Sequence, residues 1–321
     1  MQDRAPPART RLPWRAVAPS IRSEIERRLG WSVAEATDHS GGFSPGAVAE
    51  LRSADGRAAF VKAVSTDQNP DSPSMARRER RVASALPEGF PAPRLLHGLD
   101  DGHWVALVYE HIDADNPIVP WRPDQLDDVV ASIAGLAQWV SPSPVDGLAS
   151  LTDTLAEDFS GWRRLAAGGP SSSPDGPDLA DDWIQPNLDR LAEVEAGWDR
   201  AAAGTSLVHL DLRSDNLLID GHGKVWFVDW AHGSIGAAWV DLVFLLPSVA
   251  MEGGPDPEQA WTRSPFAAID AEAVTAVVAA VAGFFTYQAR QPPPPGLPTL
   301  RAFQEAQGVW ARRWLRTRLG L

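Results

Sequence analysis

The chain contains no cysteine among its 321 residues. Disulfide bonds, cysteine-ligated zinc sites and cysteine nucleophiles are therefore excluded. It also has little in the way of long apolar runs, and the longest, Ala273 to Phe285, is too short to span a bilayer. The N-terminal stretch MQDRAPPARTRLPWR has no apolar centre, so it does not fit a secretory signal, and its prolines disfavour an amphipathic transit helix. These absences predict a cytoplasmic protein that does not enter a membrane.

Basic residues are scarce, with 29 Lys and Arg against 42 Asp and Glu, and the net charge is −13. The charged residues are unevenly distributed along the chain. Residues 1–109 hold 15 basic and 13 acidic residues, whereas residues 110–321 hold 14 basic and 29 acidic residues. An acidic second half disfavours nucleic acid as a partner, because phosphates need basic side chains. It is compatible with an amine-bearing partner, or simply with a well-solvated acidic surface.

Apolar residues make up 44% of the chain, which is typical of a folded protein, and the length is sufficient for two sizeable cores. After a leader over residues 1–22, which overlaps a short helix expected at 20–29, the first part favours strands. Asp55-Gly56 and Asp100-Asp101-Gly102 are hairpin turn signals between them. The expected strands are 31–38, 47–53, 58–64, 94–99 and 104–111, with a helix over 74–86.

The remainder of the chain is predicted to be mainly helical. Residues 124–140 place Leu126, Val129, Val130 and Ile133 at helical spacing. Further helices are expected over 152–166, within 179–203, and over 271–288 and 300–319. The predicted organisation is therefore a β-rich N-terminal part over 1–109 and a helical C-terminal part over 110–321.

The most informative segment lies between residues 207 and 247. It contains His209, Asp211, an asparagine five residues later at Asn216, and Asp229 after the next apolar strand. Phosphoryl transfer from ATP needs a carboxylate beside the attacking hydroxyl and hard oxygen ligands for Mg²⁺. Asp211 suits the first role, and Asn216 with Asp229 suits the second.

The spacing of these residues resembles the catalytic loop and magnesium aspartate of protein kinases, with two departures. Leu210 replaces the arginine of His-Arg-Asp, and Trp230-Ala231 replaces Phe-Gly after the magnesium aspartate. With these departures the segment is similar to the aminoglycoside phosphotransferase and choline kinase family of small-molecule phosphotransferases. The resemblance covers roughly residues 31–320. It implies an α+β, bilobal protein-kinase-like fold, with a β-rich N-lobe and a mainly helical C-lobe.

Lys62 lies in the middle of the apolar strand AAFVKAV, where an unpaired charge would be costly to bury. One interpretation is an edge strand with Lys62 in water. The other is that Lys62 contacts the nucleotide phosphates. Its partner would then be Glu79, the single carboxylate of the next predicted helix.

Two further nucleotide elements follow from order along the chain. Gly41, Gly42 and Ser44 lie in a loop between two predicted strands, where backbone can approach phosphate oxygens, although an ordinary hairpin turn would look the same. The family resemblance places the interlobe hinge after the strand that ends near residue 111. It therefore assigns adenine recognition by backbone groups to Glu110 and Ile112.

Asp241 matches, by resemblance, an aspartate that braces the catalytic loop, either as a helix N-cap or as a buried acceptor, and His209 is expected to be scaffold. The resemblance predicts an ATP- and magnesium-dependent enzyme acting on a small-molecule hydroxyl, including aminoglycoside-like antibiotics as candidate acceptors. The acidic residues Asp113, Asp115, Glu157, Asp158 and Glu252 are candidates for binding a cationic acceptor. Alternatives are a protein kinase and a nucleotide-binding regulator without turnover. The sequence leaves open ATP against GTP, and monomer against homodimer.

Overall fold

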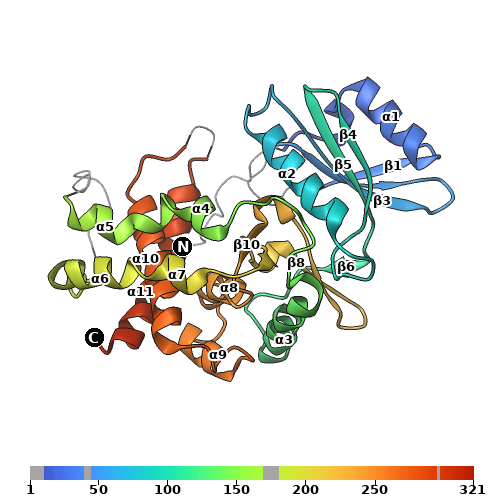
Figure 1. Ribbon diagram of the computed structural model, residues 1–321. Helices are drawn as coiled ribbons and strands as arrows, with labels where there is room; N and C mark the ends of the chain where they lie inside the picture. The colour runs from blue at the N-terminus through green and yellow to red at the C-terminus, as the bar shows by residue number, and fades with distance from the viewer. Residues whose placement is uncertain (1–10, 40–44, 169–180, 295–296) are drawn as a thin grey trace, which may run out of the picture. The chain divides into compact units, whose positions relative to one another are not determined.

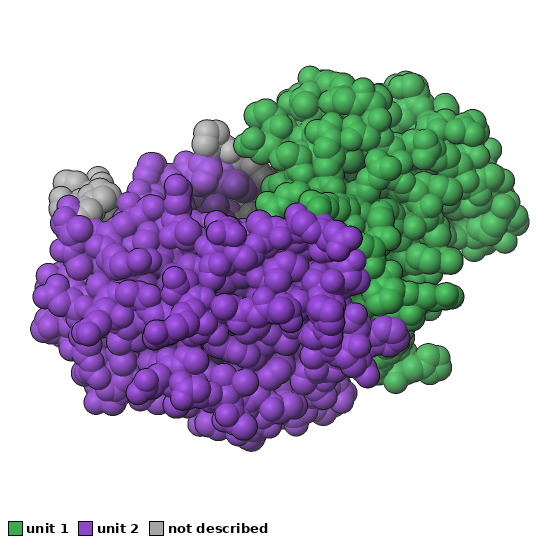
Figure 2. Space-filling view, in the orientation of Figure 1, with its two compact units in different colours: residues 1–116, 215–233 green, residues 117–214, 234–321 purple. Residues whose placement is uncertain are grey.

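The computed structural model describes residues 11–39, 45–168, 181–294 and 297–321. The chain forms two compact units (Figure 2). Unit 1 comprises residues 1–116 and 215–233, and unit 2 comprises residues 117–214 and 234–321. The boundary predicted after residue 109 lies near the first crossing between the units. It does not anticipate that residues 215–233, which carry Asn216 and Asp229, return to unit 1.

Unit 1 is built on a five-stranded antiparallel sheet in the order β1-β2-β3-β5-β4 (Figure 1). The strands are β1 (Glu35–Asp38), β2 (Ala47–Arg52), β3 (Ala58–Ser65), β4 (Leu95–Asp100) and β5 (Trp104–Glu110). Both predicted turns are present, with Gly56 at φ 89° and Gly102 at φ 90°, a backbone conformation that glycine adopts without steric cost.

Alternation along the strands divides the core of unit 1 into two layers. Ala106 and Val108 of β5 pack in the same cluster as Ile21 and Ile25 of helix α1 (Pro19–Leu29). The intervening β5 residues Val105, Leu107 and Tyr109 form a second cluster together with residues of helix α2 (Ser72–Ala85). Since successive side chains of a strand point to opposite faces, α1 and α2 cover opposite faces of the sheet.

A second, three-stranded antiparallel sheet completes unit 1. It contains β6 (Ala114–Asp115), β8 (Leu217–Asp220) and β9 (Val225–Phe227), in the order β6-β8-β9. The N–H of Phe227 also donates to the carbonyl of Pro91, which ties β9 to the segment between α2 and β4. The chain therefore comes back into unit 1 through a hairpin, with Asn216 just before β8 and Asp229 shortly after β9.

The strand predicted over residues 31–38 is only half formed, because β1 begins at Glu35. The N–H of Val33 donates to the Glu26 carboxylate at 2.9 Å instead of joining the ladder. The leader prediction for residues 1–22 is also wrong over its second half. Trp14 and Val17 are buried in the α1-side core, and a short 3₁₀ turn spans Trp14–Ala16.

Unit 2 is mainly helical, with a two-stranded sheet formed by β7 (Ser206–Val208) and β10 (Ser234–Gly236). Two long predicted helices, α10 and α11, are observed with the bounds expected from the sequence. The helices are α3 (Pro123–Val140), α4 (Leu151–Leu155), α5 (Gly161–Ala166), α6 (Leu188–Glu195), α7 (Trp198–Ala202), α8 (Val240–Met251), α9 (Pro257–Arg263), α10 (Ala271–Gln288) and α11 (Leu300–Leu319).

Helix α10 forms the centre of unit 2 and packs against α5, α6, α7, α8 and α11 (Figure 1). Among the described residues, it is the one helix long and apolar enough to cross a membrane, and 56% of it is buried in this unit. A core helix that is enclosed by neighbours has apolar residues on all sides. The packing of α10 therefore accounts for its composition.

The single helix predicted over residues 152–166 is instead two helices, α4 and α5, with a turn at Asp158–Ser160. Phe159 leaves helical geometry, at ψ 45°. The turn lets α5 begin at Gly161, where the backbones of α5 and α10 meet. A Cβ atom at Gly161 would lie 2.0 Å from the carbonyl oxygen of Gly283.

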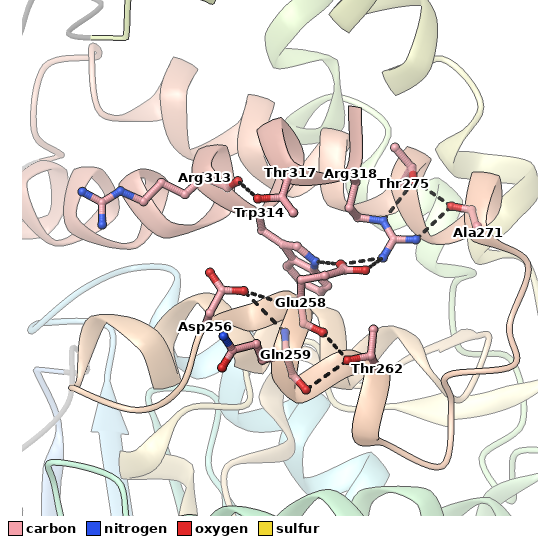
Figure 3. A network of polar contacts seen from close by, with 10 residues as sticks. All are labelled: Asp256, Glu258, Gln259, Thr262, Ala271, Thr275, Arg313, Trp314, Thr317 and Arg318. Carbon is pink, nitrogen blue, oxygen red and sulfur yellow. Dashed lines mark hydrogen bonds and ion pairs between the residues drawn. The ribbon is translucent and has the colours of Figure 1, made fainter. Parts of the chain in front are cut away.

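A polar network joins α9, α10 and α11 at one end of unit 2 (Figure 3). The Glu258 carboxylate of α9 accepts hydrogen bonds from Trp314 Nε1 and, at 2.7 Å, from Arg318 Nη1 of α11. The same guanidinium donates to Thr275 Oγ1 and to the Ala271 carbonyl of α10. The Arg318 side chain is 7% exposed, and the Glu258 carboxylate is the anion that pairs with it.

We expect Glu258→Ala to destabilise unit 2, because it leaves the buried Arg318 guanidinium and Trp314 N–H without their carboxylate. The loss should be about 1–3 kcal/mol, which corresponds to a fall of roughly 3–10 °C in Tm. Thermal unfolding measures this, with Glu193→Ala, an exposed carboxylate on α6, as the matched control. Equal Tm values for the two variants would show that the network contributes nothing to stability.

Candidate active site

Lys62 lies on β3 and forms an ion pair with Glu79 of α2. The Lys62 Nζ to Glu79 Oε1 distance is 2.8 Å, as the sequence predicts. Strand alternation explains the pairing. Ala59, Val61 and Ala63 belong to the α1-side core, whereas Phe60 and Val64 belong to the α2-side core. Lys62 is two residues from both Phe60 and Val64, so its side chain points to the same face of the sheet, which α2 covers. The interpretation of Lys62 as a solvent-facing edge lysine is wrong, since β3 is flanked by β2 and β5.

Two more groups complete this cluster in unit 1. Tyr109 of β5 donates its hydroxyl to Glu79 Oε1 at 2.9 Å. Asp229 Oδ1 lies 3.2 Å from Lys62 Nζ. Burial lowers the pKa of Lys62, but the neighbouring Asp229 and Glu79 carboxylates outweigh it and raise this pKa above its ordinary value. Lys62 is therefore a fixed, permanently charged cation between two carboxylates, which is suited to holding an anionic phosphate.

Asn216 and Asp229 are brought to one end of the β8–β9 hairpin by its register. Leu217 pairs with Phe227, so the residue before β8 and the residues after β9 lie side by side. The N–H of Val228 donates to the Asn216 carbonyl at 3.0 Å, which fixes this proximity. One carboxylate and one amide oxygen match the few protein ligands that Mg²⁺ takes when phosphates and waters supply the others. The donor set therefore fits Mg²⁺.

Asp229 has a left-handed backbone, at φ 68°, which is uncommon for a residue with a side chain. The residue that follows holds it there. Trp230 is buried, donates its ring N–H to the Phe227 carbonyl at 3.0 Å, and packs edge-on against Phe90 at 5.5 Å between ring centroids. Trp230, which departs from the Phe of protein kinases, is thus the anchor that sets the direction of the Asp229 side chain.

Asp211 belongs to unit 2, in the loop after β7. The Asp241 carboxylate, in the first turn of α8, accepts the backbone N–H groups of His209 and Leu210, each at 2.8 Å. Leu210 has φ 66°, and the N–H of Asp211 donates to His209 Nδ1 at 3.3 Å. Burial raises the pKa of Asp241, while His209 and the two N–H groups act in the opposite direction. Asp241 is therefore a buried acceptor that shapes the loop and not an N-cap, since the cap position is Trp239.

The other end of the loop is also fixed within unit 2. Ser214 Oγ donates to Glu252 Oε1 at 2.7 Å, and Trp121 Nε1 donates to Glu252 Oε2 at 2.7 Å. Arg213 Nη1 lies 3.2 Å from Asp211 Oδ1. The chain then passes into unit 1 between Ser214 and Asp215. Asp211 thus belongs to unit 2, whereas Asn216 and Asp229 belong to unit 1.

The remaining predicted nucleotide residues are less well placed. Gly41, Gly42 and Ser44 lie outside the described residues. Glu110 ends β5, and its N–H donates to the Arg94 carbonyl at 3.0 Å, so this amide is used within unit 1. Ile112 follows in coil and is half-buried. Adenine recognition by Glu110 and Ile112 stays a prediction.

Sequence reasoning missed Tyr109 and also Arg11. The N–H of Leu12 donates to the carbonyl of Pro45, so the chain beside Arg11 lies along the end of the β1–β2 loop. Burial lowers the pKa of Arg11, while the carboxylates of Asp229 and Asp215 oppose this shift. The spacing of Trp14, Val17 and Ile21 was the available signal that the leader packs on the sheet.

Known proteins resemble this chain in sequence profile and in fold. The sequence profile described as "Phosphotransferase enzyme family" matches residues 35–279. A search of curated proteins gave no match. Solved structures, in contrast, are similar over nearly the whole chain.

An aminoglycoside phosphotransferase from Alicyclobacillus acidocaldarius has a TM-score of 0.59 and 16% identity, covering 98% of this chain and 99% of that one. A spectinomycin phosphotransferase in complex with ADP and spectinomycin has a TM-score of 0.60 and 12% identity, covering 94% and 98%. A choline kinase from Streptococcus pneumoniae has a TM-score of 0.57 and 13% identity, also covering 94% and 98%. The predicted kinase-like fold is confirmed.

Proposed function

The chain belongs to the phosphotransferase enzyme family, and from this membership we propose that it transfers a phosphoryl group from ATP to a hydroxyl of a small molecule, with Mg²⁺ as cofactor. The observation that carries the proposal is the Lys62–Glu79 ion pair, 2.8 Å long, with Asp229 at 3.2 Å from the same ammonium. The ADP complex of the similar spectinomycin phosphotransferase supports the choice of nucleotide.

Each group has a role that follows from its chemistry. Lys62, oriented by Glu79 and Tyr109, neutralises phosphate charge on the nucleotide. Asn216 and Asp229 would hold Mg²⁺, which would offset the negative charge of the nucleotide phosphates. Asp211 orients the acceptor hydroxyl and takes its proton as the new P–O bond forms, while the bond from the γ-phosphorus to the bridging oxygen breaks and ADP leaves. Positioning and electrostatics then provide most of the rate enhancement.

The length of chain after Asp229 supports a small-molecule acceptor over a protein acceptor. Ten residues separate Asp229 from the start of α8 at Val240, and they form the 3₁₀ turn Trp230–His232 and strand β10. This leaves little chain for an activation loop of the protein-kinase type. A regulator without turnover is the other alternative, and the presence of Lys62, Asp211, Asn216 and Asp229 argues against it.

We further propose an amine-bearing acceptor. Unit 2 holds 13 basic and 23 acidic residues, whereas unit 1 holds 16 and 19, so the acidic excess is greater in the unit that carries Asp211. Asp113 and Asp115 lie in unit 1, outside the helical part to which they were assigned from sequence. Glu252 is the best-placed candidate, because the two donors that contact it, Ser214 Oγ and Trp121 Nε1, are neutral and do not offset its negative charge.

A panel of cationic, neutral and anionic alcohols, each assayed with ATP and Mg²⁺, tests the function and the acceptor class together. We expect turnover that is highest with amine-bearing alcohols and that falls as salt screens the attraction. In Glu252→Gln, the amide oxygen can accept from Trp121 Nε1 while the amide N–H donates to Ser214 Oγ, so the contacts remain and only the charge is lost. We expect kcat/KM for a cationic acceptor to fall about tenfold, with little change for a neutral one. Preferential phosphorylation of uncharged alcohols without salt dependence would refute the amine-bearing class, and absence of turnover would refute the function.

A further inference from the structure

The catalytic loop carries a second charged group besides Asp211. Arg213 follows it by two residues, its side chain is 16% exposed, and its Nη1 atom lies 3.2 Å from Asp211 Oδ1. A guanidinium remains protonated at any accessible pH and its donors have a rigid planar geometry. Arg213 thus contacts the carboxylate that must be aimed at the acceptor hydroxyl.

The position of Arg213 is in turn set from outside the loop. Its Cζ atom lies over the ring of Phe303 at 5.5 Å from the centroid, within the range of a cation–π contact. Phe303 is in the first turns of α11, which are anchored by Arg301. Arg301 Nη1 donates to Gln288 Oε1 of α10 and to Gln304 Oε1, each at 2.8 Å. The C-terminal helix therefore reaches the catalytic loop through one aromatic ring.

We propose that Phe303 and Arg213 together position Asp211, so that α11 is part of the machinery that orients the catalytic carboxylate. This inference rests on the proposed function. Phe303 fixes the plane of the guanidinium, and the guanidinium fixes the rotation of the carboxylate. Neither residue is a catalytic residue in this scheme, because both act through Asp211.

The chemistry of the reaction favours such an arrangement. Pairing with a cation makes a carboxylate a weaker base. In a loose phosphoryl-transfer transition state, however, the metaphosphate-like group is already electrophilic and the acceptor hydroxyl needs orientation more than strong basicity. Small misplacement of a reacting group can cost about a hundredfold in rate. An ion pair that fixes Asp211 therefore aids the reaction more than it hinders it.

The alternative is that the Arg213–Asp211 pair is an ordinary, partly exposed salt bridge. Such a pair contributes little to stability and nothing to turnover. The two interpretations differ in what Phe303→Leu should do. Leucine keeps an apolar side chain on α11 and removes only the ring face, so an ordinary salt bridge predicts no change in kcat.

The experiment uses Phe303→Leu, Arg213→Met, Arg213→Lys and the double variant Phe303→Leu/Arg213→Met, with kcat, both KM values and Tm measured for each. Trp310→Leu is the matched control, since Trp310 makes a cation–π contact with Arg313 on the same helix, at 4.8 Å. We expect kcat to fall about tenfold or more in Arg213→Met and severalfold in Phe303→Leu, with KM for ATP and Tm unchanged. Arg213→Lys should recover part of the loss. The double variant should be no slower than Arg213→Met, because Phe303 acts on Asp211 only through Arg213.

Wild-type kcat in Phe303→Leu, or losses that multiply in the double variant, would overturn the positioning role while leaving the proposed function intact. A fall in Tm parallel to the fall in kcat would assign the pair to structure alone. A wild-type protein without turnover on any alcohol would instead remove the proposed function itself. The two failures are therefore distinguishable.

Discussion

Asp211→Asn should reduce kcat by about a hundredfold or more while nucleotide affinity stays near the wild-type value. Asparagine has nearly the same shape but cannot accept the hydroxyl proton, and it loses the ion pair with Arg213 at 3.2 Å. The loop itself should keep its conformation. Its backbone N–H groups are held by Asp241, which the substitution does not touch.

Initial rates at saturating ATP and acceptor measure this effect, and a binding titration with a non-hydrolysable nucleotide measures the affinity. Asp199→Asn, an exposed carboxylate on α7 of the same unit, is the matched control. A kcat for Asp211→Asn within about threefold of wild type would show that Asp211 does not carry the proton.

The second large effect is expected at Asp229. Asp229→Ala should abolish the part of nucleotide affinity that depends on Mg²⁺, because it removes the carboxylate at the end of the β8–β9 hairpin. Stability should change little, since the side chain is 43% exposed and Lys62 retains Glu79. Asp241→Ala should instead lower stability. It leaves two buried N–H groups without an acceptor, at a cost of about 1–3 kcal/mol each.

Calorimetric titration of ATP with Mg²⁺ and with a chelator, together with thermal unfolding, separates the two roles. Chelation should bring wild-type affinity down to that of Asp229→Ala and leave the variant unchanged. An Asp241→Ala protein with wild-type Tm but without metal-dependent affinity would mean that the roles of the two aspartates are exchanged.

Sequence reasoning succeeded where local rules and tertiary packing agree. Lys62 stands in the middle of an apolar strand, and Glu79 is the single carboxylate of the next predicted helix; the observed ion pair confirms this pairing. Helices α10 and α11 were predicted with their observed bounds, because α10 is a long apolar segment and the proline-rich residues 291–298 separate it from α11 in the sequence. Asn216 and Asp229 were selected from residue spacing, and their role as magnesium ligands stays a prediction.

The features that the sequence did not predict depend on contacts between residues that are far apart in the chain. Periodicity could not reveal the break between α4 and α5, because Gly161 is required by contact with Gly283, more than a hundred residues later. Tyr109 could not be distinguished in the sequence from the apolar residues of its strand, because its hydroxyl bonds to Glu79, which belongs to a separate helix. The Arg213–Phe303 contact is likewise invisible in sequence, since it joins a loop to a helix that begins at Leu300.

The route of the chain through unit 1 has a consequence for biosynthesis. Strand β6 pairs with β8, and the partners Asp115 and Ile219 are about a hundred residues apart. A ribosome adds about 5–20 residues per second, so β6 waits roughly 5–20 s for its partner to be made. During that interval the nascent chain has Lys62 and Glu79 but neither Asn216 nor Asp229. Unit 1 therefore stays incomplete while helices α3 to α7 of unit 2 emerge, and unit 2 is complete only after α11 has followed.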